Sequence, residues 1–394
     1  MTHPISDEYT ELRTQLRRFL QERIAPRLRE AERTGIYPEG LIEEVGAAGF
    51  FGTWFPERVG GSAMDYRAPA IVADEMGNLT PQLSVALNQQ GMSCPYTILE
   101  FGRKDIAEPF VRDLLAGRKI GMWSLTESGG GSDPANTVKT RAVRDGDHYV
   151  INGSKMFATG ANRCDVGVLF ARTSSEPGHR SLSAFIVEPR KCPGWRAEPI
   201  RFQGLSRVFN TCEVSIEDLR VHKDMLLGEE GDGFKIAMQG LVYGRLSVGA
   251  RALGVAKGVL EEGAAYVNNR MLKGEPLSKF QAIQMEFGEV DASVFAAEAA
   301  LYSAIDLLNA RQPANRAMAI AKYVCGRAAK QAAELIGPMF GGYSLAEEYR
   351  ICDLRAHANL FEIGEGSPHV QKLLIGQHRL GLKDADRGET RHLE

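Results

Sequence analysis

Apolar residues recur at helical spacing through the first part of the chain, from residue 6 to about residue 119. One stripe of this kind holds Leu12, Leu16, Phe19 and Leu20. Because proline has no amide hydrogen to donate, Pro26 is expected to interrupt this first helix. The same spacing predicts further helices over residues 41–51, 68–76 and 106–115. Residues 1–119 are therefore predicted to form an all-helical domain.

Between residues 120 and 227 the period shortens to two residues, which is the spacing of β-strands. We predict strands over residues 137–143, 148–151, 166–171, 182–187 and 212–216. The dipeptides Asp145-Gly146 and Asn152-Gly153 interrupt these runs, and such pairs are typical of tight hairpin turns. Residues 120–227 therefore predict a compact middle domain, either a β-barrel or a β-sandwich.

Helical spacing returns at residue 228 and continues to about residue 382. Two of its stripes are Leu241, Arg245, Val248, Ala252, Val255 and Val259, and then Phe287, Val290, Val294 and Leu301. The Arg311-Gln312-Pro313 break separates two long antiparallel helices, so residues 228–382 predict a C-terminal four-helix bundle. Residues 383–394 are polar and predict a flexible tail. The fold class is α+β.

Composition is that of an ordinary globular protein, with 44% hydrophobic and 25% charged residues. The net charge of −3 offers no basic surface for nucleic acid or for an anionic membrane. No run approaches the roughly 20 apolar residues that a membrane span needs. The first thirty residues carry acids and lack the apolar core of a signal peptide. We therefore expect a cytoplasmic protein that has no membrane span.

Cysteine and histidine positions argue against a metal site. The six cysteines are dispersed without any Cys-x-x-Cys pair, which counts against both a zinc site and a disulfide framework. Reduced and mostly buried thiols are expected instead. His148, His222, His357 and His369 show no metal-ligand spacing, and we expect structural or surface roles for His357 and His369.

Two short runs carry candidate chemistry. Residues 123–133 combine three glycines with several hydroxyl side chains, so backbone N–H groups there can closely approach an anion or a flat ring. This run is neither a Walker loop nor a dinucleotide-binding loop, because no Gly-Lys-Ser or β–α unit follows. Phe157 and Thr159 lie two residues apart on one predicted strand, where they can flank a planar cofactor from the same side. Taken alone, a surface loop and ordinary sheet packing explain the two runs equally well.

Taken together, these runs and others in order along the chain resemble the acyl-CoA dehydrogenase family. The matching elements are Thr126-Glu127, Gly131-Ser132-Asp133, Lys139-Thr140, Asn152-Gly153, Lys155-Met156, Leu227-Gly228-Glu229-Glu230-Gly231, Gly233-Phe234, Arg245, Arg270, Phe280-Gln281, Gly341-Gly342 and Glu365-Gly366-Ser367. Their order and spacing match the family over nearly the whole chain. The sequence departs from the family pattern at Val242, Lys273, Pro338 and Ala356-His357.

The resemblance implies bound FAD and a homotetramer. Thr126 and Thr159 would hydrogen-bond the edge of the isoalloxazine ring, and Phe157 would lie against that ring. Arg270 would reach the FAD pyrophosphate of a neighbouring subunit. The full set implied to bind FAD is Trp123, Leu125, Thr126, Gly131, Ser132, Phe157, Thr159, Arg270, Gln281, Gly341, Gly342, Ser367 and His369. The residues implied to bind the substrate are Ser132, Arg245 and Gly366.

The family also supplies one carboxylate, from one of two places, to remove the α-proton of an acyl thioester. One place is the Glu of a Glu-Gly-Thr element, which is Glu365 here, and the other is the residue before Arg245, which is Gly244 here. Glu365 is thus the only candidate in either place. Glu362, one helical turn away, is the alternative among nearby carboxylates. An apolar setting beside the flavin would raise the pKa of such a carboxyl and help it to accept a proton.

The implied reaction is the FAD-dependent oxidation of an acyl-CoA, or of an acyl-carrier-protein thioester, to the trans-2-enoyl product. Glu365 would take the α-proton while a hydride leaves the β-carbon for flavin N5. The Glu365 backbone N–H and a ribityl hydroxyl of FAD would bind the thioester oxygen. An electron-transfer flavoprotein would then receive the electrons.

Two other functions remain open from the sequence. A flavin monooxygenase of the same fold usually lacks the glutamate, so Glu365 counts against that function. A thioester-binding protein without turnover is supported only by the departures at Lys273 and Pro338.

One segment of the sequence bears on which acyl group the substrate carries. By resemblance, residues 84–101 line the acyl end of the pocket, and they include three consecutive amides, Asn88, Gln89 and Gln90. No Arg or Lys occurs in this segment before Arg103. A dicarboxylate such as glutaryl needs a cation, so this segment counts against such a substrate.

Overall fold

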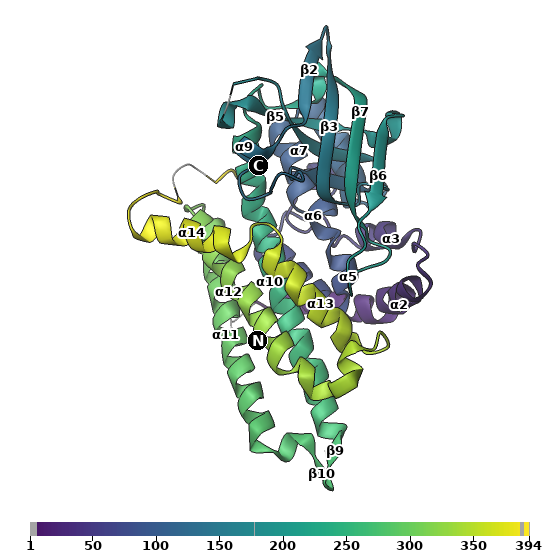
Figure 1. Ribbon diagram of the computed structural model, residues 1–394, viewed down its shortest axis with the longest axis vertical. Coiled ribbons are helices and arrows are strands. Elements are labelled where there is room, and N and C mark those ends of the chain that lie inside the picture. Colours follow the sequence, from purple (N-terminus) through teal and green to yellow (C-terminus); the bar gives the residue numbers. More distant parts are fainter. Residues whose placement is uncertain (1–5, 177, 387–389, 394) are drawn as a thin grey trace.

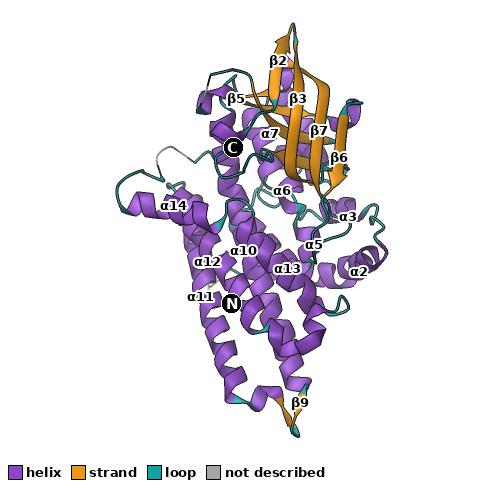
Figure 2. Ribbon diagram, in the orientation of Figure 1, coloured by secondary structure: helices purple, strands orange, loops and turns teal. Residues whose placement is uncertain are grey.

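The computed structural model describes residues 6–176, 178–386 and 390–393. Helices form the first part of the chain, a β-sheet the middle, and long helices the last part (Figures 1 and 2). The sheet lies at the top of this view and the long C-terminal helices extend below it, while N-terminal helices contact both. The α+β fold class predicted from the sequence is confirmed.

The N-terminal helices largely follow the predicted apolar stripes. They are α1 (Asp7–Phe19), α2 (Ala25–Thr34), α3 (Leu41–Ala47), α4 (Arg67–Leu79), α5 (Pro81–Ser84), α6 (Leu87–Gln90), α7 (Ser93–Phe101) and α8 (Lys104–Leu115). The expectation that Pro26 interrupts the first helix is wrong, because a π-helical turn (Leu20–Ile24) joins α1 to α2. Pro26 lies in the first turn of α2, where its missing N–H is tolerated.

The middle region forms one eight-stranded sheet within the described residues. Its strands are β1 (Gly121–Ser124), β2 (Arg141–Asp145), β3 (His148–Thr159), β4 (Val166–Arg172), β5 (Leu182–Val187), β6 (Trp195–Pro199), β7 (Thr211–His222) and β8 (Leu226–Leu227), and the short helix α9 (Pro134–Thr137) precedes β2. The order is β6-β7-β3-β2-β4-β5-β8, with β1 parallel to β4. β4 and β5 are buried along nearly their whole length, because one face lines the sheet's own core and the other meets the helices.

The two predicted hairpin turns have different outcomes. Asp145-Gly146 does join β2 to β3 in an antiparallel hairpin, with Gly146 at φ +60°. The turn predicted at Asn152-Gly153 is wrong, because β3 continues through this pair and only its register against β7 shifts there. Gly153 adopts φ +152°, and a Cβ at this position would lie 2.5 Å from Thr140 Oγ1. The dipeptide therefore forms a β-bulge. Like the predicted hairpin turn, this bulge needs glycine, because the backbone has a positive φ that other residues rarely adopt.

The C-terminal region contains the predicted four-helix bundle, made of α10 (Gly233–Asn269), α11 (Gln281–Asn309), α12 (Asn315–Leu335) and α13 (Arg350–Ile363). A small hairpin of β9 (Met271–Leu272) and β10 (Glu275–Pro276) joins α10 to α11, and α14 (Pro368–Arg379) follows the bundle. α10 also packs closely on α4, since a Cβ on Gly254 would lie 1.9 Å from the Asp74 carbonyl oxygen. Within the described residues, no helix is long and apolar enough to cross a membrane.

Buried ion pairs join the N-terminal helices to the bundle. Asp74 on α4 accepts from Arg13 on α1 at 2.8 Å and from Lys257 on α10 at 2.9 Å. Lys257 also pairs with Glu298 on α11 at 2.6 Å. Removing one partner of such a network leaves an uncompensated charge, so these pairs fix how the four helices meet.

The described part of the tail predicted to be flexible, residues 383–386 and 390–393, makes hydrogen bonds with the helices. The Arg391 carbonyl oxygen accepts hydrogen bonds from Tyr96 at 2.9 Å and from Tyr243 at 2.5 Å. His392 lies 2.9 Å from the Tyr66 hydroxyl. The polar composition of the tail did not predict these contacts, because they are largely hydrogen bonds and need few apolar residues.

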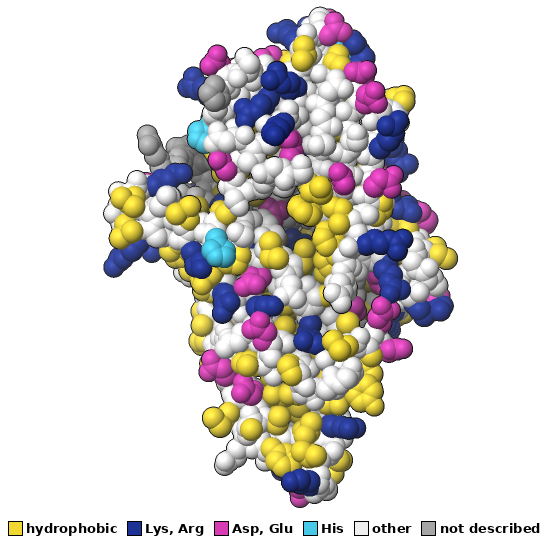
Figure 3. Space-filling model, viewed as in Figure 1, with side chains coloured by type: hydrophobic (Ala, Val, Ile, Leu, Met, Phe, Trp, Pro, Cys, Tyr) yellow, Lys and Arg dark blue, Asp and Glu magenta, His cyan; other side chains and the backbone are white. Residues whose placement is uncertain are grey.

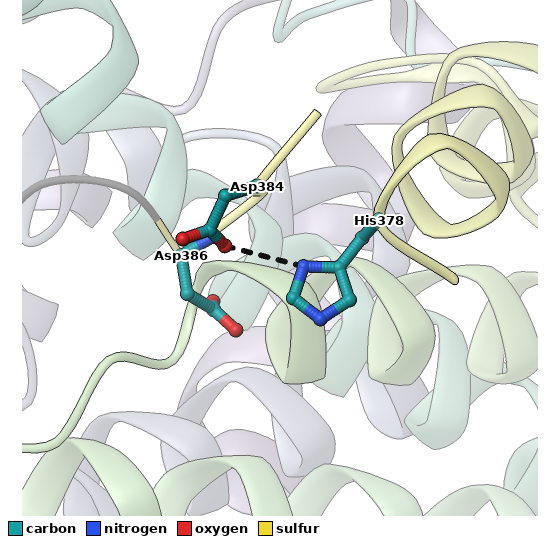
Figure 4. A group of neighbouring side chains, drawn as sticks. All are labelled: His378, Asp384 and Asp386. Atoms are coloured by element: carbon teal, nitrogen blue, oxygen red, sulfur yellow. Dashed lines mark hydrogen bonds and ion pairs between the residues drawn. The ribbon is translucent and has the colours of Figure 1, made fainter. Parts of the chain in front are cut away.

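Three side chains near the start of the tail lie close together. The ligand atoms of His378, Asp384 and Asp386 all lie within 4.8 Å of one another (Figure 4). His378 Nδ1 accepts the Ala385 backbone N–H at 3.2 Å and lies 3.3 Å from Asp384, while Asp386 accepts the Arg316 backbone N–H at 2.8 Å. These side chains thus already have partners within the chain, and they fasten the tail to α14 and α12.

Candidate active site

Glu365 lies in the short loop between α13 and α14. The face of the molecule shown in Figure 3 is hollowed below the sheet. The Glu365 backbone is left-handed, with φ +56°, a conformation that costs a non-glycine residue about 1–3 kcal/mol. The residue as a whole is partly exposed, but its carboxylate is enclosed and Oε2 has no solvent contact. The loop therefore turns this carboxylate inward.

Two buried side chains hold the backbone of this loop. Lys322 on α12 donates to the carbonyl oxygens of Glu362 and Gly366, both at 2.7 Å. Gln371 on α14 donates to the carbonyl oxygens of Glu365 at 3.3 Å and Gly366 at 3.1 Å. These bonds satisfy carbonyls that the strained turn leaves outside helical hydrogen bonding.

The Glu365 carboxylate has one bonded and one unbonded oxygen. Asn88 on α6 donates from Nδ2 to Oε1 at 2.7 Å. Oε2 has no hydrogen-bond partner and faces Gly244 on α10, where an added Cβ would lie 2.6 Å away. Glycine is therefore needed at this point of α10, because any side chain would push the carboxylate aside.

Cations surround this buried carboxylate. Burial raises the pKa of Glu365, and the charges of Arg251, Arg245 and Lys322, with the Asn88 hydrogen bond, only partly oppose that rise. Arg245 is itself buried and donates to Asn315. Burial also lowers the pKa of Lys322 to about 8, with Glu365 pulling it upward. The site thus combines an enclosed, proton-accepting carboxylate with positive charge that favours its ionised form.

A second cluster organises the glycine-rich run. Glu127 is buried, and its carboxylate accepts from Lys155 Nζ at 2.8 Å, from the Lys139 backbone N–H at 2.6 Å and from the Thr140 backbone N–H at 3.0 Å. Burial acts to raise the pKa of Glu127, but the Lys155 charge and these hydrogen bonds outweigh it and hold the pKa below its usual range. This carboxylate fastens the run to β3 and to the segment before β2.

The same region brings together the predicted ring-binding residues. The Met156 backbone N–H donates to the Thr126 carbonyl at 2.9 Å, so the run lies directly beside β3. Gly131 lies against the Thr126 side chain, where a Cβ would be 3.2 Å from Thr126 Cγ2. Trp123 on β1 donates to Thr97 at 3.3 Å, and Leu125 is buried behind the run.

Phe157 and Thr159 deviate from simple strand alternation. The register of β3 against β7 shifts between Lys155 and Ala158, and Phe157 adopts φ +60°. The Phe157 ring is 57% exposed, whereas Thr159 is half-buried and bonded to Thr211 at 2.9 Å. An exposed aromatic ring beside a glycine-rich run fits a planar group such as the flavin, and the bulge rather than strand periodicity sets the ring's direction.

The remaining residues that the resemblance implies for FAD lie away from the glycine-rich run and β3. Arg270 lines one surface pocket together with Gly341 and Gly342. Arg270 follows Gly244 by 26 residues, which corresponds to about 39 Å along α10 at about 1.5 Å per residue. Gln281 is the exposed first residue of α11.

The residues after the Glu365 turn start a new helix. Ser367 is the N-cap residue of α14, Gly366 adopts φ +96°, and the exposed His369 follows in the first turn of α14. Ser132 is exposed in the glycine-rich run. His357 is fully buried, and its Nδ1 lies 2.8 Å from the Asp353 carbonyl oxygen, as a structural histidine does.

Sequence reasoning missed two cations that act on Glu365, Lys322 and Arg251. Lys322 falls within the apolar stripe of α12, and a lysine in such a stripe was the available signal. Arg251 on α10 donates to the Ser84 carbonyl oxygen at 2.9 Å, so a cation does reach the segment that lacks its own. The inference against a dicarboxylate substrate stays a prediction, because this bond does not show whether the cation meets the acyl group. The alternative carboxylate, Glu362, instead pairs with Arg327 at 3.6 Å.

Similar proteins are known for the whole chain. Family models described as the N-terminal, middle and C-terminal domains of acyl-CoA dehydrogenase match residues 6–118, 123–219 and 231–380. The glutaryl-CoA dehydrogenase of Desulfococcus multivorans is 32% identical over 391 residues, 98% of this chain and 100% of that protein. A subunit of the caffeyl-CoA reductase–Etf complex of Acetobacterium woodii is 30% identical over 381 residues, 94% of this chain and 97% of that protein. A solved glutaryl-coenzyme A dehydrogenase with glutaryl-CoA has a TM-score of 0.94 at 31% identity and covers 100% of both chains.

The buried Glu127–Lys155 pair yields a stability prediction. Lys155→Met leaves the Glu127 carboxylate buried without its cation, so the free energy of unfolding should fall by about 3–5 kcal/mol. Chemical denaturation monitored by circular dichroism measures this change. Lys139→Met is the matched control, because only the backbone of Lys139 contacts Glu127 and its side chain is exposed. Equal stability of the Lys155→Met variant and the wild type would contradict the pairing.

The Lys322 contacts yield a second prediction, about the loop that carries Glu365. Lys322→Met removes two charge-assisted hydrogen bonds, each worth about 1.5–3 kcal/mol. Amide hydrogen exchange over residues 363–367 should therefore become at least tenfold faster. Lys330→Met, on the same helix but bonded to Asn359, is the control and should leave that exchange unchanged. Unchanged exchange in Lys322→Met would show that Gln371 alone holds the loop.

Proposed function

Because the chain belongs to the acyl-CoA dehydrogenase family of FAD-dependent oxidoreductases, we propose that Glu365 is the base that removes the α-proton of its acyl thioester. The observation that carries this proposal is the enclosed carboxylate, whose Oε1 is bonded to Asn88 and whose Oε2 has no hydrogen-bond partner. A carboxylate oxygen with a free lone pair, in a setting that raises its pKa, is suited to accept a proton.

The thioester binds between Glu365 and the glycine-rich run. The backbone N–H of Glu365 donates to the thioester oxygen, where negative charge develops as the α-proton leaves. Its direction is set by the left-handed turn that Lys322 and Gln371 hold. Arg245, Gly366 and Ser132 are the further residues proposed to contact the substrate.

Bound FAD supplies the acceptor for the hydride of the β-carbon. Glu365 takes the α-proton on Oε2, so the acyl thioester loses one proton and one hydride and becomes the trans-2-enoyl thioester. The residues proposed to hold the isoalloxazine end are Trp123, Leu125, Thr126, Gly131, Ser132, Phe157 and Thr159, with Ser367 and His369 from the Glu365 side. Those proposed for the adenosine end are Arg270, Gln281, Gly341 and Gly342.

The adenosine-end residues support a proposed homotetramer. Arg270 lies about 39 Å along α10 from Gly244, so it serves an FAD bound to another copy of the chain. Met271 and Leu272, which follow Arg270 directly, are exposed, and so are Met285 and Phe295 on α11. Exposed apolar side chains are common on surfaces that another chain covers.

The electron acceptor, the carrier of the acyl group and the location are also proposed. The relative from Acetobacterium woodii is part of an Etf complex, which supports an electron-transfer flavoprotein as the acceptor. The relatives named above act on CoA thioesters, which supports acyl-CoA over an acyl-carrier protein. A cytoplasmic location fits the six cysteines, which form no disulfide.

Replacing the base separates binding from chemistry. Glu365→Gln is nearly isosteric and keeps the backbone donor, so FAD and thioester should still bind while anaerobic flavin bleaching slows by about 10²–10⁴-fold. Stopped-flow absorbance with a panel of acyl thioesters measures the rate. Glu362→Gln is the matched control and should stay active. An active Glu365→Gln with an inactive Glu362→Gln would show that Glu362 is the base. Normal turnover by both variants would favour a flavin monooxygenase instead.

The position of Gly244 allows a relocation test within the same experiment. The double change Glu365→Gly with Gly244→Glu removes the Glu365 side chain and places a carboxylate on α10 in the space that it leaves. It should bleach the flavin faster than Glu365→Gly alone. Gly244→Ala with Glu365 intact should slow bleaching, because its Cβ displaces the carboxylate and small displacements lower the rate strongly.

Charge reversal at Arg270 tests the proposed assembly. Arg270→Glu places a negative charge beside the FAD pyrophosphate, so both FAD retention and oligomer stability should fall. Light scattering coupled to gel filtration, with absorbance at the flavin band, measures both together. Lys104→Glu, an exposed charge reversal on α8, is the control. A stable monomer that retains stoichiometric FAD would contradict the proposal.

A further inference from the structure

Asn88 and Glu365 share an incomplete pair of hydrogen bonds. Asn88 Nδ2 donates to Glu365 Oε1 at 2.7 Å, across 277 residues of sequence. The other oxygen of each side chain, Asn88 Oδ1 and Glu365 Oε2, is buried without a hydrogen-bond partner. Both atoms are acceptors when Glu365 is ionised, so neither can satisfy the other. Buried polar atoms without partners are uncommon, and two in one side-chain pair ask for an explanation.

We propose that Asn88 is a positioning residue that selects Oε2 of Glu365 as the proton-accepting oxygen. This inference rests on the proposed role of Glu365 as the base. The proton that leaves the substrate α-carbon becomes the Oε2–H group, while Oε1 keeps its hydrogen bond from Asn88.

The selection follows from the direction of the existing hydrogen bond. Oε1 already accepts from Asn88, so its lone pair is less available to a proton than that of Oε2. After the transfer, Oε1 becomes the carbonyl oxygen of the acid and still accepts from Nδ2. The Asn88 contact therefore persists in both protonation states, and the carboxyl group changes its charge without turning.

The platform beneath Asn88 is rigid. Gln90, on the same short helix, donates to the carbonyl oxygens of Leu114 at 3.0 Å and Lys119 at 2.9 Å. Its Oε1 accepts the Gly121 backbone N–H at 2.7 Å. These bonds join α6 to the end of α8 and to β1, so the Asn88 amide meets Glu365 from a fixed position.

The effect on pH dependence has a definite sign. Arg245 and Arg251 on α10 and Lys322 on α12 are the charged groups that act on Glu365, and all three remain when Asn88 is changed. The Asn88 donor favours the ionised carboxylate and opposes burial, which raises the pKa of Glu365. Removing the donor raises that pKa further, so less of the base is ionised at a given pH. Activity should be lost at the acid end of the profile.

Asn88→Leu keeps the branched shape and removes both polar atoms. In the FAD-loaded enzyme, the acid limb of the kcat/KM profile should move upward by about one to two pH units. Thioester binding should stay within about threefold of the wild type. Asn88→Asp keeps the size and a polar group, and two carboxylates sharing one proton should move the acid limb upward by more. This second variant keeps the test valid if the leucine variant folds poorly.

A readout without turnover separates this inference from the proposed function. The infrared band of the protonated Glu365 carboxyl, isolated by subtracting the Glu365→Gln spectrum, should titrate one to two pH units higher in Asn88→Leu. This titration reports on the pair even if no acyl thioester is oxidised. An unmoved band and an unmoved acid limb would overturn the inference, whatever the overall loss of activity. A further rate loss when Asn88→Leu is added to Glu365→Gln would also overturn it, because the two side chains would then act independently.

Discussion

The site depends on keeping one enclosed carboxylate ionised. Burial alone makes a carboxyl neutral, and a neutral carboxyl is no base. Arg251 and Lys322 counter that effect in a particular way, because their hydrogen bonds go to the carbonyl oxygens of Ser84, Glu362 and Gly366. A carbonyl satisfies the donor without cancelling its charge, whereas a carboxylate partner would have neutralised it. The positive charge is therefore left to act on Glu365 while the cations themselves stay hydrogen-bonded.

The long helix α10 links this site to the rest of the molecule. It contributes Gly244, which gives room to Oε2, and the cations Arg245 and Arg251. Arg270 follows its other end. A helix of 37 residues is a stiff rod about 55 Å long, so residues at its two ends cannot serve one small cofactor in one chain. Under the proposed role of Arg270 in binding FAD, the rigidity that aligns the groups around Glu365 also implies that Arg270 serves the FAD of another copy of the chain.

Much of the fold followed from local patterns, and the failures share a cause. The apolar runs of β4 and β5 and the long bundle helices were predictable because burial imposes their periodicity. Asn152-Gly153 was read as a turn because a bulge needs the same glycine conformation. The sequence motif predicts Glu365 as the base, but the Asn88 contact joins residues 277 positions apart and leaves no local pattern. The sequence shows that Asn88 is polar, but only the tertiary structure shows that it bonds to Glu365.

The left-handed turn at Glu365 has a physical reason of its own. A glycine there would remove the strain but also the carboxylate, so the chain keeps a side chain where the backbone disfavours one. Gly366 follows, also left-handed, and a Cβ on it would lie 2.5 Å from Gln371 Nε2. The strain is thus confined to one residue, and the bonds from Lys322 and Gln371 prevent its relaxation. If Glu365 acts as the proposed base, it does not need to reorganise its backbone when it receives a proton, and that is the condition under which a hydrogen-bonded partner such as Asn88 can select the oxygen that receives it.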